Sequence, residues 1–156
     1  MANVNMTPAA GASNYPDLEK PVAFYEKIRR IDMADAYAKK GSNLAATDVI
    51  QAVTVKAGEM VCSVSAKIIT ACSAAMTATI GDGDDPDGYV TSVSLNGTAS
   101  TVTSAVGALL QSGTTPFAIT QGKVYSADDT IDLVLGGTAA NNGVVEVRVL
   151  CRNWNA

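Results

Sequence analysis

A short acidic loop holds the residues with the clearest chemical potential. Residues 80–89 (IGDGDDPDGY) contain four carboxylates within a stretch of six residues, namely Asp82, Asp84, Asp85 and Asp87. Such carboxylates repel one another unless a positive charge compensates them, and Ca²⁺ is a hard cation that prefers oxygen ligands. The spacing differs from an EF-hand, because Pro86 takes the third ligand position and Val93 the twelfth. Two interpretations follow. One is a calcium site formed by these four residues; the other, which we favour, is a tight turn using Gly, Asp and Pro for their backbone preferences.

A second acidic group lies in residues 126–135 (SADDTIDLVL), where Asp128, Asp129 and Asp132 offer a carboxylate pair for acid–base catalysis. Asp at the start of a strand is ordinary turn chemistry, and we favour that explanation. The chain contains no His, which excludes Ser-His-Asp and Cys-His nucleophiles and zinc sites of the His type. We therefore predict that the protein is not an enzyme and has no resident cofactor apart from the possible Ca²⁺.

Charge and cysteine content limit the partners and the disulfide bonds that we expect. The chain has 156 residues, 11 of them basic and 15 acidic, for a formal net charge of −4, so we expect no nucleic-acid partner. Basic residues gather in the N-terminal third, and acids in two loops near 82–87 and 128–132. This polarity suits head-to-tail association of copies, or simply reflects two solvated acidic loops. Cys62, Cys72 and Cys151 form no C-x-x-C pair, which favours three reduced thiols; a Cys62–Cys72 bridge across a hairpin stays open.

The first 20 residues are predicted to form an extended N-terminal arm, because Pro8, Gly11 and Pro16 punctuate them and apolar periodicity is absent. Residues 1–14 lack the basic and apolar regions of a signal peptide. No apolar run is long enough to cross a membrane. We expect no membrane partner, and a protein that acts inside the cell that makes it or leaves that cell by lysis.

Residues 22–31 (VAFYEKIRRI) fit either a helix or a strand. Phe24, Ile28 and Ile31 have helical spacing, but the β-branched and aromatic content favours a strand. In that strand Phe24 and Ile28 share one face, and Tyr25 and Ile31 lie on the other.

Strands dominate the rest of the chain. A short helical turn is expected first, over residues 32–41, with Asp32 as its cap and Gly41 at its end. Alternating apolar and polar residues then predict strands over 47–56, 60–70, 76–80, 89–95, 116–119, 123–126, 129–135 and 143–152. Residues 96–105 are expected to form a connection.

The alternation also predicts which side chains share a face. In the first of these strands they are Val49, Val53 and Val55, and in the second Met60, Cys62, Val64, Ala66 and Ile68. In the last strand the inner face is expected to consist of Val145, Val147, Val149 and Cys151. The last two strands are expected to pair as a hairpin, because glycines and asparagines occupy residues 136–143. About eight strands and one helical turn predict an all-β fold, an antiparallel β-sandwich that is jelly-roll-like, over residues 21–156.

Several short motifs resemble a known family. They are Val55-Lys-Ala-Gly58, the acidic stretch Gly81–Tyr89, the run Tyr125–Val134 and the closing strand Gly143–Val149. Together they resemble the small β-sandwich structural proteins of tailed-bacteriophage virions, and in particular head decoration (cement) proteins. This resemblance implies a non-enzymatic protein that decorates and stabilises a capsid. It also implies a homo-oligomer, most often a trimer, that binds the major capsid protein, with residues 1–20 reaching neighbouring subunits. Such a protein is made in the cytoplasm of the bacterial host and is located on the capsid surface of the virion.

A different function class stays open. A receptor- or glycan-binding module of a phage tail or fibre would need aromatic side chains on one exposed face. Tyr89, Tyr125 and Trp154 are the candidates, and core packing is the alternative for all three.

Overall fold

A computed structural model describes residues 24–104 and 122–153. The predicted N-terminal arm (1–20), the predicted strand 116–119 and Trp154 lie outside the described residues. The prediction of one domain over residues 21–156 covers these gaps and stays a prediction.

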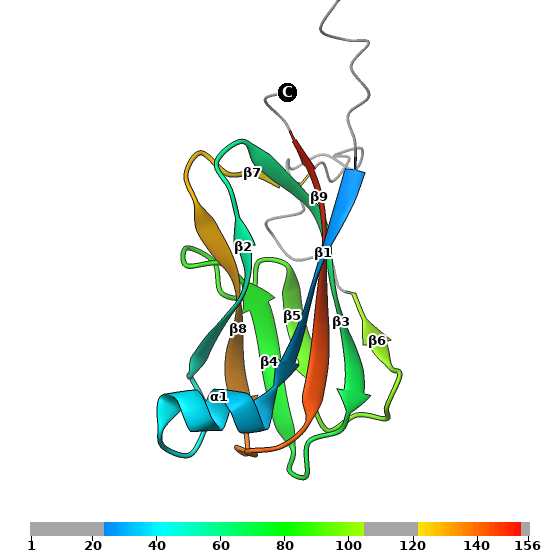
Figure 1. The fold of residues 1–156 in the computed structure, drawn as a ribbon. Coiled ribbons are helices and arrows are strands. Elements are labelled where there is room, and N and C mark those ends of the chain that lie inside the picture. Colours follow the sequence, from blue (N-terminus) through cyan, green and yellow to red (C-terminus); the bar gives the residue numbers. More distant parts are fainter. Residues whose placement is uncertain (1–23, 105–121, 154–156) are drawn as a thin grey trace, which may run out of the picture.

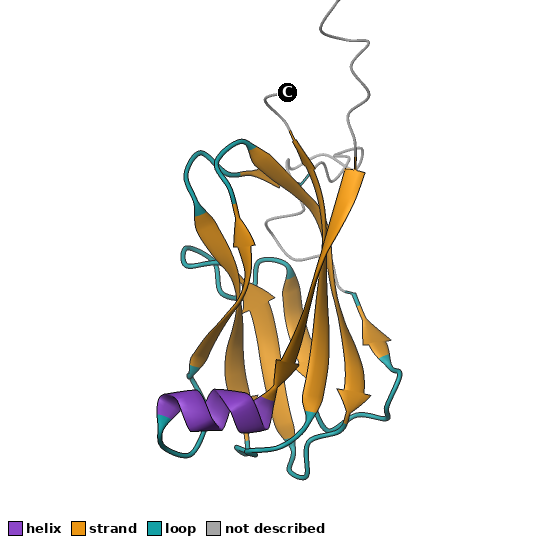
Figure 2. Ribbon diagram, viewed as in Figure 1, coloured by secondary structure: helices purple, strands orange, loops and turns teal. Residues whose placement is uncertain are grey.

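The described residues form two antiparallel sheets that face each other, as Figures 1 and 2 show. The first sheet has the order β1-β9-β3-β6, and β7 also pairs with β3; the second has the order β2-β8-β4-β5. The elements are β1 (Phe24–Asp32), α1 (Met33–Lys40), β2 (Val49–Val55), β3 (Glu59–Thr70), β4 (Met76–Gly81), β5 (Val90–Ser94), β6 (Val102–Thr103), β7 (Lys123–Val124), β8 (Asp129–Gly137) and β9 (Val144–Asn153). The predicted all-β sandwich is confirmed.

Residues 24–32 form a strand, which settles the ambiguity of the sequence. β1 pairs along its whole length with β9. Phe24 and Ile28 are exposed on its outer face, while Tyr25 is partly buried and Ile31 is buried on the other. The strand prediction and its two faces are confirmed.

The helical turn is also confirmed. Asp32 is the N-cap, and its side chain accepts a hydrogen bond from the backbone N–H of Ala34 at 2.9 Å. Gly41 ends the helix in the left-handed conformation, with φ of 73°. Among the described residues no helix is long and apolar enough to cross a membrane.

The core lies between the inner faces of the two sheets. On β9, Val145, Val147, Val149 and Cys151 are all buried, as their alternation predicts. On β8 the facing layer consists of Ile131, Leu133 and Leu135. All three cysteines are free, and burial raises the pKa of the Cys151 thiol to about 11.

A β-bulge changes which residues of β2 face the core. Gln51 pairs with Asp132 and Val53 with Ile131, so Ala52 has no partner across the ladder. Because side chains alternate between the two faces of a strand, one extra residue moves every preceding side chain to the opposite face. Val53 and Val55 are therefore buried, but Val49 is 56% exposed, and the prediction that it shares their face is wrong.

A second bulge acts in the same way on β3. Val61 pairs with Cys151 and Ser63 with Leu150, which leaves Cys62 as the extra residue. Val64, Ala66 and Ile68 share one face, as predicted, and that face belongs to the core. Before the bulge, however, Val61 belongs to the core cluster, whereas Met60, although buried, lies opposite Arg152, whose Nε donates to its Sδ at 3.0 Å.

The predicted hairpin of the last two strands is wrong. β8 pairs with β2 and β4, whereas β9 pairs with β1 and β3, so the two strands belong to different sheets. Their period-two pattern is the same whichever sheet they join, and it does not specify the partner. The connecting residues cross from one sheet to the other. Within the predicted connection 96–105, the structure also contains the two-residue strand β6.

Two valines on β2 test the bulge. We expect Val53→Ala to lower the free energy of unfolding by about 1.5–3 kcal/mol, because it leaves a cavity between the sheets. Val49→Ala is the matched control and should change it by less than about 0.5 kcal/mol. Urea unfolding of both variants measures the difference, and equal losses would contradict the assigned register.

Candidate functional site

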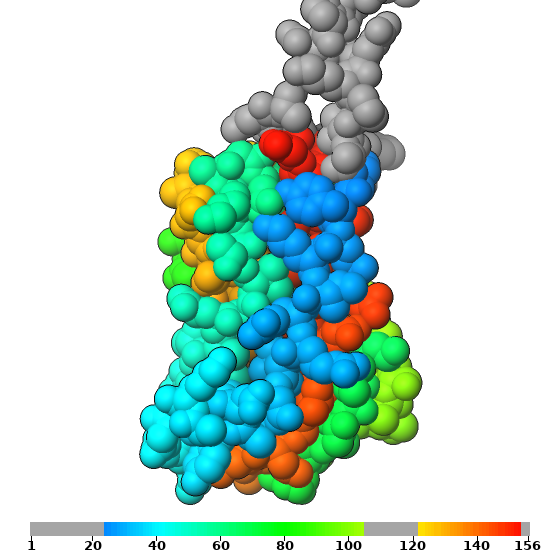
Figure 3. Space-filling model, viewed as in Figure 1, coloured from blue at the N-terminus to red at the C-terminus, as the bar shows by residue number. Residues whose placement is uncertain are grey.

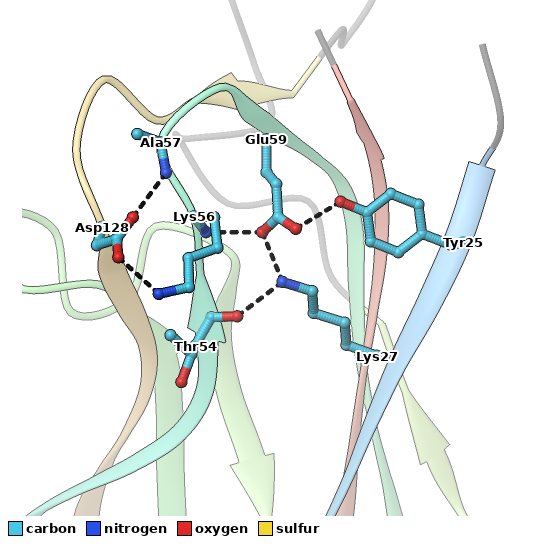
Figure 4. Close-up of polar contacts among 7 residues, drawn as sticks. All are labelled: Tyr25, Lys27, Thr54, Lys56, Ala57, Glu59 and Asp128. Atoms are coloured by element: carbon cyan, nitrogen blue, oxygen red, sulfur yellow. Dashed lines mark hydrogen bonds and ion pairs between the residues drawn. The ribbon is translucent and has the colours of Figure 1, made fainter. Parts of the chain in front are cut away.

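A polar network closes the open side of the sandwich, between edge strands β1 and β2 (Figure 4). On β1, Tyr25, Lys27 and Arg29 occupy the inward-facing positions together with Ile31. The Nζ of Lys27 donates to the backbone oxygen of Thr54 at 2.8 Å and to Oε2 of Glu59 at 2.5 Å. Lys27 therefore ties β1 of one sheet to β2 of the other.

Glu59 is the centre of this network. Besides Lys27, its carboxylate accepts hydrogen bonds from the Tyr25 hydroxyl at 2.5 Å and from the backbone N–H of Lys56 at 2.7 Å. Burial alone raises the pKa of Glu59, but these donors outweigh it and hold that pKa below its ordinary value. A neighbouring pair, Lys56 and Asp128, joins the β2–β3 turn to the residues before β8 at 2.6 Å.

The acidic loop 82–88 is organised by Asp82, whose side chain is fully buried. Its Oδ2 accepts from Lys123 Nζ at 2.6 Å and from the Tyr125 hydroxyl at 2.7 Å. Its Oδ1 accepts from the backbone N–H groups of Asp84 and Asp85, each at 3.1 Å. Lys123 therefore supplies the positive charge that the density of carboxylates requires.

The four predicted cation ligands do not converge. Asp82 points inward to Lys123, whereas the Asp84 side chain is 90% exposed and lies 3.7 Å from the same lysine. The Asp85 carboxyl lies beside Asp87, and burial together with Asp87 raises the pKa of Asp85. In residues 24–104 and 122–153 no group of three or more His, Cys, Asp or Glu side chains is arranged to hold a metal ion.

Calcium binding by Asp82, Asp84, Asp85 and Asp87 stays a prediction. It requires a heat of binding in titration calorimetry and a rise in melting temperature with added Ca²⁺. We expect Lys123→Met to strengthen both signals if the cation and the lysine compete for Asp82. Absence of heat and an unchanged melting temperature in the wild-type protein would contradict the site.

The second acidic group is dispersed as well. Asp128 pairs with Lys56 and accepts from the backbone N–H of Ala57. Asp129 accepts from the backbone N–H of Thr130. Asp132 is only 7% exposed, and its Oδ1 has no hydrogen-bond partner. Burial raises the pKa of Asp132, and the negative charges of Asp129 and Asp82 raise it further. The structure does not align these carboxylates as a catalytic pair.

Tyr89 and Tyr125 do not form an exposed aromatic platform. Both are buried, and their hydroxyl oxygens lie 2.7 Å apart. Because Tyr125 donates to Asp82, Tyr89 donates to Tyr125. Burial raises the pKa of both phenols above the ordinary value. These residues support the acidic loop and cannot stack on a sugar.

A groove lies where β1, α1 and β2 meet, on the face shown in Figure 3. It has a volume of about 350 Å³, and its lining includes Arg29, Arg30, Lys39, Val49 and Ile50. Sequence reasoning missed this site, because it depends on the bulge that turns Val49 outward. It also missed the roles of Lys27 and Glu59. The sequence did single out Lys123, since it is the one basic residue between residues 68 and 147.

The comparisons with known proteins identify the fold. No protein-family model matches the chain, and no curated protein matches it. Among solved structures, the chain is similar to a chain of the cyanophage Pam1 capsid asymmetric unit, with a TM-score of 0.58 and 15% identity over 96% of this chain and 99% of that one. It is also similar to a chain of the capsid structure of Helicobacter pylori bacteriophage KHP30, with a TM-score of 0.54 and 12% identity over 83% and 87%. At these identities the likeness establishes a shared fold.

The Asp82 network predicts a pH-dependent stability. The hydrogen bonds to Lys123 and Tyr125 outweigh burial and hold the pKa of Asp82 below its ordinary value. The stabilisation is therefore present above the unfolded-state pKa of about 3.9 and is lost as pH falls through the lower folded-state value. We expect Asp82→Asn to lower the free energy of unfolding by roughly 1.5–3 kcal/mol at pH 7 and much less near pH 2. Urea unfolding at both pH values tests this, and a loss independent of pH would contradict it.

For Asp132 we expect the opposite effect of pH on the free energy of unfolding. Its folded-state pKa is raised, so the folded protein holds a buried carboxylate at a cost once the pH exceeds the unfolded-state value. We expect Asp132→Asn to raise the free energy of unfolding by about 1 kcal/mol at pH 7. The gain should vanish below about pH 4, where both states are protonated. A destabilised variant at pH 7 would show that the charge is compensated.

Proposed function

We propose that this protein is a non-enzymatic virion structural protein that decorates and stabilises a bacteriophage capsid through symmetric protein–protein contacts. The observation that carries the proposal is the likeness of the chain, over 96% and 83% of its length, to chains from two phage capsid structures. We interpret the strand orders β1-β9-β3-β6 and β2-β8-β4-β5 as those of a jelly roll. From β1 to β4 successive strands lie in opposite sheets, and β4 then pairs with β5 within one sheet. We further propose that its partner is the major capsid protein, that it forms a trimer of identical subunits, and that it is located on the capsid surface.

The surface chemistry supports a contact protein. The outer face of the β1-β9-β3 sheet exposes large apolar side chains between charged ones. Leu150 of β9 lies opposite Glu26, diagonal to both Phe24 and Ile28 of β1, within reach of their side chains. The exposed set on this sheet is Phe24, Ile28, Val102, Val124 and Leu150. Exposed apolar residues gathered on one face mark a protein-binding surface.

The polar networks point away from catalysis. The best-placed polar groups, around Glu59 and Asp82, are consumed by internal hydrogen bonds and ion pairs that join strands. Among the described residues, two carboxylates line the groove beside α1, Asp32 and Asp35, and Asp32 is the helix cap. These groups hold the sandwich together, which suits a protein that resists mechanical load.

Binding to capsids lacking this protein tests the proposal. We expect the wild-type chain to co-sediment with such capsids and to raise the temperature at which they release their contents. Ile28→Asp combined with Leu150→Asp should weaken binding by at least about tenfold, equivalent to about 1.4 kcal/mol. Thr91→Asp, at an exposed position of β5 in the other sheet, is the matched control. No binding by the folded wild-type protein would contradict the proposed function.

A further inference from the structure

The groove beside α1 has an apolar floor. Ile31 is buried, and Ala36 and Ile50 pack partly against the core. Val49 adds an exposed wall, because the bulge at Ala52 turns it outward. About 350 Å³ lies within the size range of small binding sites in proteins.

The rim of the groove is basic. Arg29, Arg30, Lys39 and Lys40 line it, against Asp32 and Asp35. Lys40 is paired with Asp48 at 2.5 Å, and Asp32 caps the helix. Within the described part of the chain, Arg29 and Lys39 have no ion pair within 4 Å. The groove is therefore lined by more basic than acidic side chains, and two of the basic ones have no ion-pair partner among the described residues.

The matching negative charge lies on the same protein, in the loop 82–88. Asp84 and Asp87 are exposed at its tip. The loop is rigid, because its base is fixed by Asp82 and because the Thr79 hydroxyl donates to the carbonyl of Pro86 at 2.9 Å. A Cβ on Gly81 would overlap the carbonyl oxygen of Asp85, so the loop packs directly on the end of β4. A rigid loop loses little conformational entropy when it binds.

The two surfaces cannot meet within one subunit. The groove lies along β2, which is one edge of its sheet, and the acidic loop joins β4 to β5 at the other edge. Figure 1 shows this loop projecting away from β1. A contact between them joins different surfaces of two copies, and such heterologous contacts close into rings when the rotation permits.

We propose that the groove formed by β1, α1 and β2 binds the acidic loop 82–88 of a second copy of this chain. The carboxylates of Asp84 and Asp87 pair with Arg29 and Lys39, and the apolar floor covers the tip of the loop. This proposal deepens the assembly role proposed above and rests on it. It defines the contact by which a ring of copies forms.

Light scattering during size-exclusion chromatography tests the contact. We expect wild-type protein to be an oligomer at low ionic strength and to dissociate in 1 M salt, where the screening length falls to about 3 Å. Arg29→Glu with Lys39→Glu should give monomers, and so should Asp84→Lys with Asp87→Lys. All four substitutions in one chain restore the charge match with reversed sign and should restore the oligomer. Lys67→Glu, on β3 away from the groove, is the control and should leave the mass unchanged.

Three results would overturn the proposal: a monomeric wild-type protein, an oligomer that survives both pairs of charge reversals, or a fourfold variant that stays monomeric although folded. Circular dichroism establishes folding, and if the groove variant unfolds, the loop variant decides. Capsid binding is a separate readout. A monomer that binds capsids would refute this contact alone, whereas an oligomer that ignores capsids would refute the decoration role alone.

Discussion

Two sheets can bury one common apolar layer only if every strand turns the correct side chains inward, and here two β-bulges meet that constraint. The bulge at Ala52 keeps Val53 in the core and turns Val49 out to the wall of the groove. The bulge at Cys62 keeps Val61 in the core and places Met60 on the outer face. Both bulges therefore set the composition of the core, and the bulge at Ala52 also forms the wall of the groove.

Charged groups complete the sandwich where apolar packing ends. β1 and β2 are edge strands of opposite sheets, and the gap between them is bridged by Lys27, Glu59 and Tyr25. At the acidic loop, Asp82 and Lys123 have the same role for β4 and β7. Desolvating such pairs is expensive, but removing one partner leaves a buried charge and costs more. Of the four carboxylates in the acidic loop, Asp82 is therefore a structural group, whereas Asp84 and Asp87 stay exposed.

The sequence was informative where a local rule decides the outcome. The strand at 24–32, the capped helix from Asp32 to Gly41 and the inner face of β9 all follow from local pattern and turn chemistry. It failed where the answer depends on a distant partner. No local sequence pattern near Val49 or Cys62 predicts a bulge. The alternation in β8 and β9 is the same whether the two strands form a hairpin or lie in separate sheets. The acidic loop was found from sequence, but its counter-charge comes from Lys123, 41 residues away.

The proposed virion role requires that the chain is a repeated structural component of a phage particle. Quantitative mass spectrometry of purified particles, from cells that produce the chain, measures this directly. We expect the protein to be present in a fixed, simple ratio to the major capsid protein and to remain after washing at moderate salt. Its absence from the particles, or a copy number too low to follow the capsid lattice, would contradict the proposed role.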